Sequence, residues 1–192
     1  TSFAAPATIT INANASDPDG SVTKVEFYQG TTKLGEDLTR PYSFTWRRVN
    51  TGSYNLTVKA TDNSGLVSTS FAASVTVGRI PITVTAESKT KVYGGSEPTL
   101  TYRITSGALA GTDTFNGSLT REAGEDIGTY AIIQGTLSLS NNYSLTYTGA
   151  GFTITADYEI KTYPNPFTDH ISFEVELNYD SGVTLEIFRL SG

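Results

Sequence analysis

The chain has 192 residues, of which 17% are charged, and its formal net charge at pH 7 is −6. This negative charge argues against a nucleic-acid partner, because the phosphates of the nucleic acid would repel the chain. Cysteine is absent, which excludes a disulfide framework, a thiolate zinc site and a thiol nucleophile.

Residues 1–78, the first module, have the pattern of a β-sandwich. Hydrophobic residues alternate with polar ones over short segments, most clearly at 54–60. Turn signals rich in Asp, Asn and Gly separate these segments at 17–20, 29–31, 50–52 and 62–65. Short alternating strands with a turn about every ten residues are typical of a β-sandwich. No segment shows helical spacing, so we predict an all-β fold.

Four segments of this module carry a family resemblance. They are Ala-Ser-Asp-Pro-Asp-Gly-Ser-Val at 15–22, Lys-Val-Glu-Phe-Tyr at 24–28, Arg-Pro-Tyr-Ser-Phe-Thr-Trp at 40–46, and Gly-Ser-Tyr with Ala-Thr-Asp-Asn-Ser-Gly between 52 and 65. They resemble the bacterial immunoglobulin-like domains that recur in surface proteins and are attached to secreted enzymes. We interpret Trp46 as a core residue in preference to a sugar-stacking platform, and Tyr54 as a tyrosine corner.

Acidic residues are frequent in three turns of the first module. If consecutive strands run antiparallel, the loops at 17–20, 36–41 and 62–65 emerge at the same end of the sandwich. The acidic residues of these loops are Asp17, Asp19, Glu36, Asp37 and Asp62. Carboxylate oxygens on loops are suitable ligands for Ca²⁺, so the sequence predicts a calcium site built from Asp17, Asp19 and Asp62. The alternative is that each residue serves only its own turn.

Residues 79–156, the second module, follow a linker of only a few residues and again show short alternating segments. The segments that carry a resemblance are Lys-Val-Tyr-Gly at 91–94, Glu-Pro-Thr-Leu-Thr-Tyr at 97–102, Gly-Thr-Tyr-Ala-Ile at 128–132 and Phe-Thr-Ile-Thr at 152–155. They resemble the MBG family of bacterial surface modules, some relatives of which are described as β-grasp. The resemblance implies a second β domain. We interpret its regularly spaced tyrosines as core residues in preference to a ligand platform.

Residues 157–192 contain a segment stiffened by proline, Tyr163-Pro164-Asn165-Pro166-Phe167. Two alternating segments follow at 171–177 and 183–190, and we predict that they form a strand pair. This order resembles the start of the C-terminal sorting domain of proteins exported by the type IX secretion system of Bacteroidota. The resemblance implies recognition by the type IX machinery and delivery to the cell surface. The alternative is a proline-rich linker into another β module.

A catalytic site is difficult to assemble from these residues. The one histidine, His170, lies in the C-terminal segment, and the acidic residues cluster in turns. We therefore predict a non-catalytic chain that requires no cofactor and has no membrane span. The predicted function is that of stalk or adhesion modules of an extracellular or cell-surface protein of a Bacteroidota-type bacterium, with a surface glycan or protein as ligand. The alternative is accessory modules appended to a secreted hydrolase, where the first module contacts polysaccharide.

Overall fold

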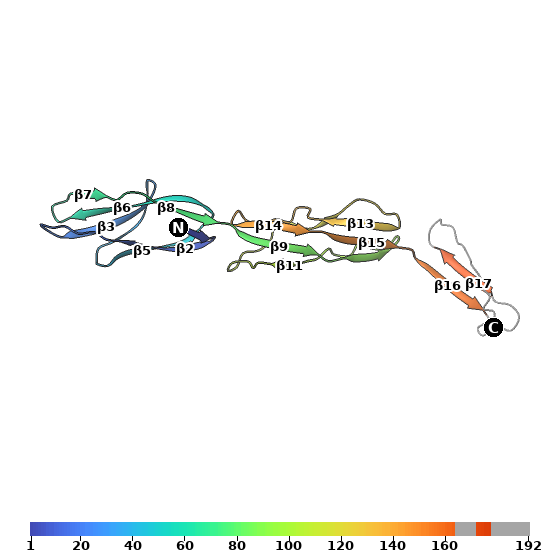
Figure 1. Ribbon diagram of the computed structural model, residues 1–192. Coiled ribbons are helices and arrows are strands. Elements are labelled where there is room, and N and C mark those ends of the chain that lie inside the picture. Colours follow the sequence, from blue (N-terminus) through green and yellow to red (C-terminus); the bar gives the residue numbers. More distant parts are fainter. Residues whose placement is uncertain (164–171, 178–192) are drawn as a thin grey trace, which may run out of the picture.

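The computed structural model describes residues 1–163 and 172–177. They form an elongated chain of β units arranged end to end, in which the first module is followed by the second and then by a hairpin (Figure 1). The predicted all-β fold is confirmed, and the described residues contain no helix. The described part of the chain therefore has no helical segment that could cross a membrane.

The first module is a sandwich of two sheets. Its strands are β1 (Ser2–Ala4), β2 (Ala7–Ala13), β3 (Val22–Gln29), β4 (Thr32–Asp37), β5 (Tyr42–Val49), β6 (Gly52–Asp62), β7 (Val67–Thr69) and β8 (Ala73–Gly78). The larger sheet has the order β1-β8-β6-β3-β4, with β7 paired to β6, and the smaller sheet consists of β2 and β5. Between the sheets lie side chains that alternate along the strands, including Val25 and Phe27, which are completely buried.

The two aromatic residues singled out in the first module have structural roles. Trp46 packs against the core edge-on to Tyr54, with ring centroids 5.0 Å apart. The Tyr54 hydroxyl donates to the backbone carbonyl of Asn50 at 2.8 Å, which is the contact of a tyrosine corner. The tyrosine corner is therefore confirmed, and Trp46 is half-buried against the core.

The second module is also built from two sheets with a separate core. Its strands are β9 (Ile80–Ala86), β10 (Lys89–Val92), β11 (Tyr102–Ser106), β12 (Thr120–Arg121), β13 (Gly128–Ile133), β14 (Tyr143–Thr148) and β15 (Ala150–Thr155). The sheet orders are β10-β15-β13-β12 and β11-β9-β14. No helix packs on either sheet in the described residues, so the structure favours a sandwich over a β-grasp form. Tyr143 is buried in the core, and the other tyrosines of the module that pack against it are Tyr93, Tyr102, Tyr130 and Tyr147.

A hairpin follows the second module. Strands β16 (Tyr158–Tyr163) and β17 (Ser172–Leu177) pair in antiparallel register, with Tyr158 opposite Leu177. The predicted strand at 171–177 is thus present, and its partner within the described residues is β16. The segment 183–190 and four residues of the predicted sorting motif, Pro164, Asn165, Pro166 and Phe167, lie outside the described residues.

Candidate functional site

The three acidic loops of the first module lie together, as predicted from strand polarity. Asn63 donates its backbone N–H to the carbonyl of Ser21, and its side-chain oxygen accepts the N–H of Ser21, both at 2.9 Å. The guanidinium of Arg40 donates to the carbonyl of Ala15 and so attaches the third loop. Gly20 lies at the contact, because a Cβ there would be 2.2 Å from the Asn63 side-chain oxygen.

Three of the five carboxylates in these loops, Asp62, Asp37 and Glu36, have local partners. Asp62 accepts three hydrogen bonds at 2.8 Å, from the hydroxyl and N–H of Ser64 and the N–H of Leu66. These donors lower the pKa of Asp62, the Ser64 hydroxyl most strongly. Asp37 accepts the N–H groups of Ser43 and Thr39, and Glu36 pairs with Lys33 at 2.7 Å. These are the contacts expected of residues that stabilise their own turns.

Asp17 and Asp19 are the carboxylates that lie beside each other. Desolvation raises the pKa of Asp17, and a hydrogen bond with Asp19 and the nearby charge of Asp62 raise it further. The three predicted ligands are therefore neighbours. No group of three or more acidic, histidine or cysteine residues in the described chain has the arrangement of a metal site.

The calcium site stays a prediction, which thermal unfolding can test. A cation that binds only the folded state stabilises it by mass action, by about 2.7 kcal/mol at one hundred times its dissociation constant. We expect millimolar Ca²⁺ to raise the melting temperature of the first module, and a chelator to reverse the change. Asp19→Ala should abolish the difference, whereas Glu36→Ala, outside the predicted ligand set, should retain it. Melting curves unaffected by calcium would show that these carboxylates only form turns.

The junction between the two modules is fixed by direct hydrogen bonds. Only Arg79 separates β8 from β9. The side chain of Asn142 accepts the N–H of Thr51 and donates to the side-chain oxygen of Asn50, both at 3.0 Å. The carbonyl of Asn142 accepts the N–H of Ile80 at 2.8 Å. One asparagine thus connects the tyrosine-corner turn of the first module to the first strand of the second.

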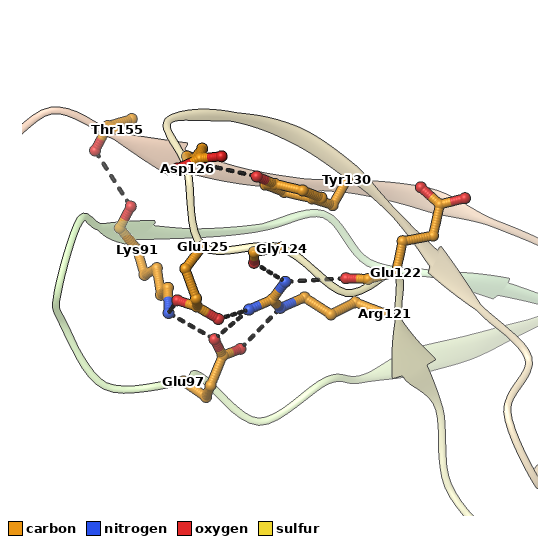
Figure 2. Close-up of polar contacts among 9 residues, drawn as sticks. All are labelled: Lys91, Glu97, Arg121, Glu122, Gly124, Glu125, Asp126, Tyr130 and Thr155. Atoms are coloured by element: carbon orange, nitrogen blue, oxygen red, sulfur yellow. Dashed lines mark hydrogen bonds and ion pairs between the residues drawn. The ribbon is translucent and has the colours of Figure 1, made fainter.

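A network of four charged side chains lies at the opposite end of the second module (Figure 2). Lys91 contacts Glu97 and Glu125 at 2.6 Å, and Arg121 contacts the same two carboxylates. The side chains of Lys91 and Arg121 are only 6% and 12% exposed. The guanidinium of Arg121 also lies over the ring of Phe152, 4.7 Å from its centroid.

All five N–H groups of Arg121 are used within the module. Two contact Glu97 and one contacts Glu125, while Nη1 donates to the carbonyls of Glu122 and Gly124 at 3.0 and 2.6 Å. The guanidinium therefore has no donor left for a ligand. Hydrogen bonds from Arg121 and then Lys91 lower the pKa of Glu97 from its usual 4.5 to about 2. The network holds two loops together and is a structural feature.

Sequence reasoning did not predict this network, although one signal for it was present. Lys91 and Glu97 lie in two of the segments that carry the MBG resemblance, 91–94 and 97–102. A lysine and a glutamate in adjacent motif segments are compatible with an ion pair. Their partners, Arg121 and Glu125, come from a distant part of the chain.

Comparisons with known proteins agree with the two sandwiches. Residues 1–58 match the model of a bacterial Ig domain, and residues 82–153 match the model of an MBG domain of the YGX type. The chain is 32% identical over 151 residues to Exoglucanase B of Cellulomonas fimi, which covers 78% of this chain and 13% of that protein. The chain therefore spans about an eighth of the length of this relative.

A solved structure of the fibronectin(III)-like modules of Clostridium thermocellum CbhA is also similar to part of the chain. It is 34% identical, covers 40% of this chain and 82% of that chain, and has a TM-score of 0.38. The Ig match covers the first sandwich from β1 into β6, and the MBG match lies within the second sandwich. The chain thus contains a bacterial Ig-like domain followed by an MBG domain.

Proposed function

We propose that the two domains are non-catalytic accessory modules of a secreted hydrolase, in which they form a stiff spacer. The observation that carries this proposal is the 32% identity to Exoglucanase B, because the matched 151 residues are long enough to include most of both domains. This similarity favours the accessory function over the adhesive stalk.

The geometry supports a spacer. The modules lie end to end, with a one-residue linker and direct hydrogen bonds from Asn142 across the junction. The neighbouring carboxylates Glu97 and Glu125 are both neutralised by Lys91 and Arg121. Glycoside hydrolysis requires one protonated and one ionised carboxyl group on either side of a substrate. Two carboxylates held ionised by the same two cations do not provide this.

A fusion experiment tests the proposal. An exoglucanase catalytic domain is joined to a cellulose-binding domain through residues 1–192, and compared with the same two domains joined by a Gly/Ser linker of equal length. A flexible linker leaves its ends close together on average, whereas a rod keeps them apart. We expect equal kcat/KM on a soluble oligosaccharide, and a higher initial rate on insoluble cellulose for the fusion that contains the two modules.

Two outcomes would contradict the proposal. Release of reducing sugar by residues 1–192 alone would make the modules catalytic. Equal rates of the two fusions on insoluble cellulose would leave the spacer without a measurable role. Binding of residues 1–192 to cellulose in the absence of a catalytic domain would add the predicted polysaccharide contact to the spacer function.

The adhesive stalk is the second candidate, and the linear arrangement of modules suits it equally well (Figure 1). In that case we propose that Tyr163-Pro164-Asn165-Pro166-Phe167 and the residues after it address the protein to type IX export and the bacterial surface. The resemblance of these residues to a sorting domain supports this alternative. The two candidates share an extracellular location, for which bacterial Ig and MBG domains are typical.

A further inference from the structure

The two modules have the same strand arrangement at the end where the chain leaves each of them. In both, the last strand lies between a short parallel strand and a longer antiparallel strand. In the first module β8 lies between β1 and β6, and in the second β15 lies between β10 and β13. The register is also the same. Gly52 pairs with Val77 in the first module as Gly128 pairs with Ile154 in the second. Tyr54 pairs with Val75 as Tyr130 pairs with Phe152.

The turn before the long strand is equivalent in the two modules as well. Tyr130 donates its hydroxyl to the carbonyl of Asp126 at 2.9 Å, just as Tyr54 donates to Asn50, in both cases across four residues. Gly52 and Gly128 precede these tyrosines by two residues, with φ of 158° and 156°. The second module therefore has its own tyrosine corner, and the turn at 126–128, here called the exit turn, corresponds to the turn at 50–52.

In the first module this turn is the docking site for the next module. It offers one acceptor, the side-chain oxygen of Asn50, and one donor, the N–H of Thr51. The carboxamide of Asn142 satisfies both at once, since a carboxamide has a donor and an acceptor on adjacent atoms.

The exit turn offers the same pair of groups. Its acceptor is the carboxylate of Asp126 and its donor is the N–H of Ile127, and neither has a hydrogen-bond partner in the described part of the chain. Two exposed apolar side chains lie at the same end of the module. Ile127 is 46% exposed and Val92 is 45% exposed. Val92 is paired with Thr155 at the end of β15. Ile127 directly precedes Gly128, which is paired with Ile154. Both side chains therefore lie where the chain leaves the module.

The hairpin returns the chain towards the end of the second module that holds this turn. Strand β16 begins three residues after Thr155, and Leu177 at the end of β17 lies opposite Tyr158. The chain therefore leaves β17 at the end of the hairpin nearest the second module, and Figure 1 shows the β17 arrow pointing back towards it. The next residue in the sequence is Asn178, which carries a carboxamide.

We propose that the exit turn is a docking site for the C-terminal unit of this chain, occupied by the segment that begins at Asn178. The carboxamide donates to Asp126 and accepts from the N–H of Ile127, and apolar side chains of the same unit cover Val92 and Ile127. The second junction then repeats the bonding of the first, with Asn178 in the role of Asn142.

Distance measurements between spin labels test this proposal on the 192-residue chain. The chain has no native cysteine, so Thr146→Cys in β14 and Glu174→Cys in β17 give one unique label pair. We expect a single narrow distance, which Asp126→Ala and Asn178→Ala each convert to a broad distribution. Asp126→Asn should retain the narrow distance, because Asn50 supplies a carboxamide oxygen at the equivalent position.

Control measurements separate docking from general loss of structure. A second label pair, Thr45→Cys with Thr146→Cys, spans the first junction and should be unaffected by Asp126→Ala but broadened by Asn142→Ala. A broad distance in the unmodified chain, or a narrow one that survives both Asp126→Ala and Asn178→Ala, would overturn the proposal. A concentration-dependent dimer in sedimentation that Asp126→Ala abolishes would also overturn it, because the occupant would then be a second copy of the chain.

Discussion

Replacing Phe27 by alanine will lower the stability of the first module by about 3–5 kcal/mol and leave that of the second unchanged, because removal of a buried aromatic ring creates a cavity. Phe27 is completely buried in a core formed only by residues of the first module. Differential scanning calorimetry of the whole chain should show one transition for each module, of which only the first moves to lower temperature.

The matched control is Phe152→Ala in the second module. Phe152 is also completely buried, in a core that contains residues of the second module alone. We expect the opposite result, in which the first transition stays in place and the second moves. If either substitution shifted both transitions by the same amount, the two sandwiches would unfold as one cooperative unit and the proposed division at residues 78 and 79 would be wrong.

Acid will destabilise the second module through its charged network. The pKa of Glu97 in the folded chain is about 2, lowered from its usual 4.5. A carboxylate with a lowered pKa contributes stability that is fully present above its unfolded pKa and is lost as the pH falls through its folded pKa. Glu125 has a pKa lowered in the same direction, chiefly by Lys91. We therefore expect the melting temperature of the second transition to fall between pH 4.5 and pH 2.

The substitution Glu97→Gln measures the contribution of Glu97 to this acid sensitivity. The variant keeps the shape of the side chain but has no carboxylate to protonate, so its second transition should start lower at pH 7 and depend less on pH. The loss is expected because Lys91, which is only 6% exposed, keeps its charge while it loses an anionic partner. Parallel melting curves for the two proteins from pH 4.5 to pH 2 would show that Glu97 does not contribute to acid sensitivity.

Much of the fold could be predicted from the sequence, because alternation and turn residues act locally. The segment at 54–60 is part of β6, Trp46 packs against the core, and Tyr54 forms its corner. The gathering of the acidic loops followed from strand polarity alone. These features depend on the two-residue period of strands and on turn chemistry, both of which can be read from neighbouring residues.

The contacts that organise the ends of the second module could not be predicted in the same way. In β10 the charged residue Lys91 is buried, whereas the apolar residue Val92 is 45% exposed. The alternation of apolar and polar residues would predict the opposite, with Val92 in the core and Lys91 at the surface. Lys91 is tolerated there because Glu125 contacts it from 34 residues away. The partners of Asn142 across the junction, Asn50 and Thr51, are more than 90 residues distant. Pairings over such separations are not encoded in local patterns.

The parallel pairing of the first and last strands of the first module has a mechanical consequence. β1 runs alongside β8 in the same direction, with Ser2 beside Thr76 and Ala4 beside Gly78. A pull on the two ends of this module therefore acts along the strands. All the hydrogen bonds between β1 and β8 then resist the sliding of one strand past the other at the same time. By contrast, if the force separated two strands from one end, their hydrogen bonds would break one after another. The second module also has a parallel pairing next to its last strand, between β10 and β15, so tension on this module likewise acts along paired strands.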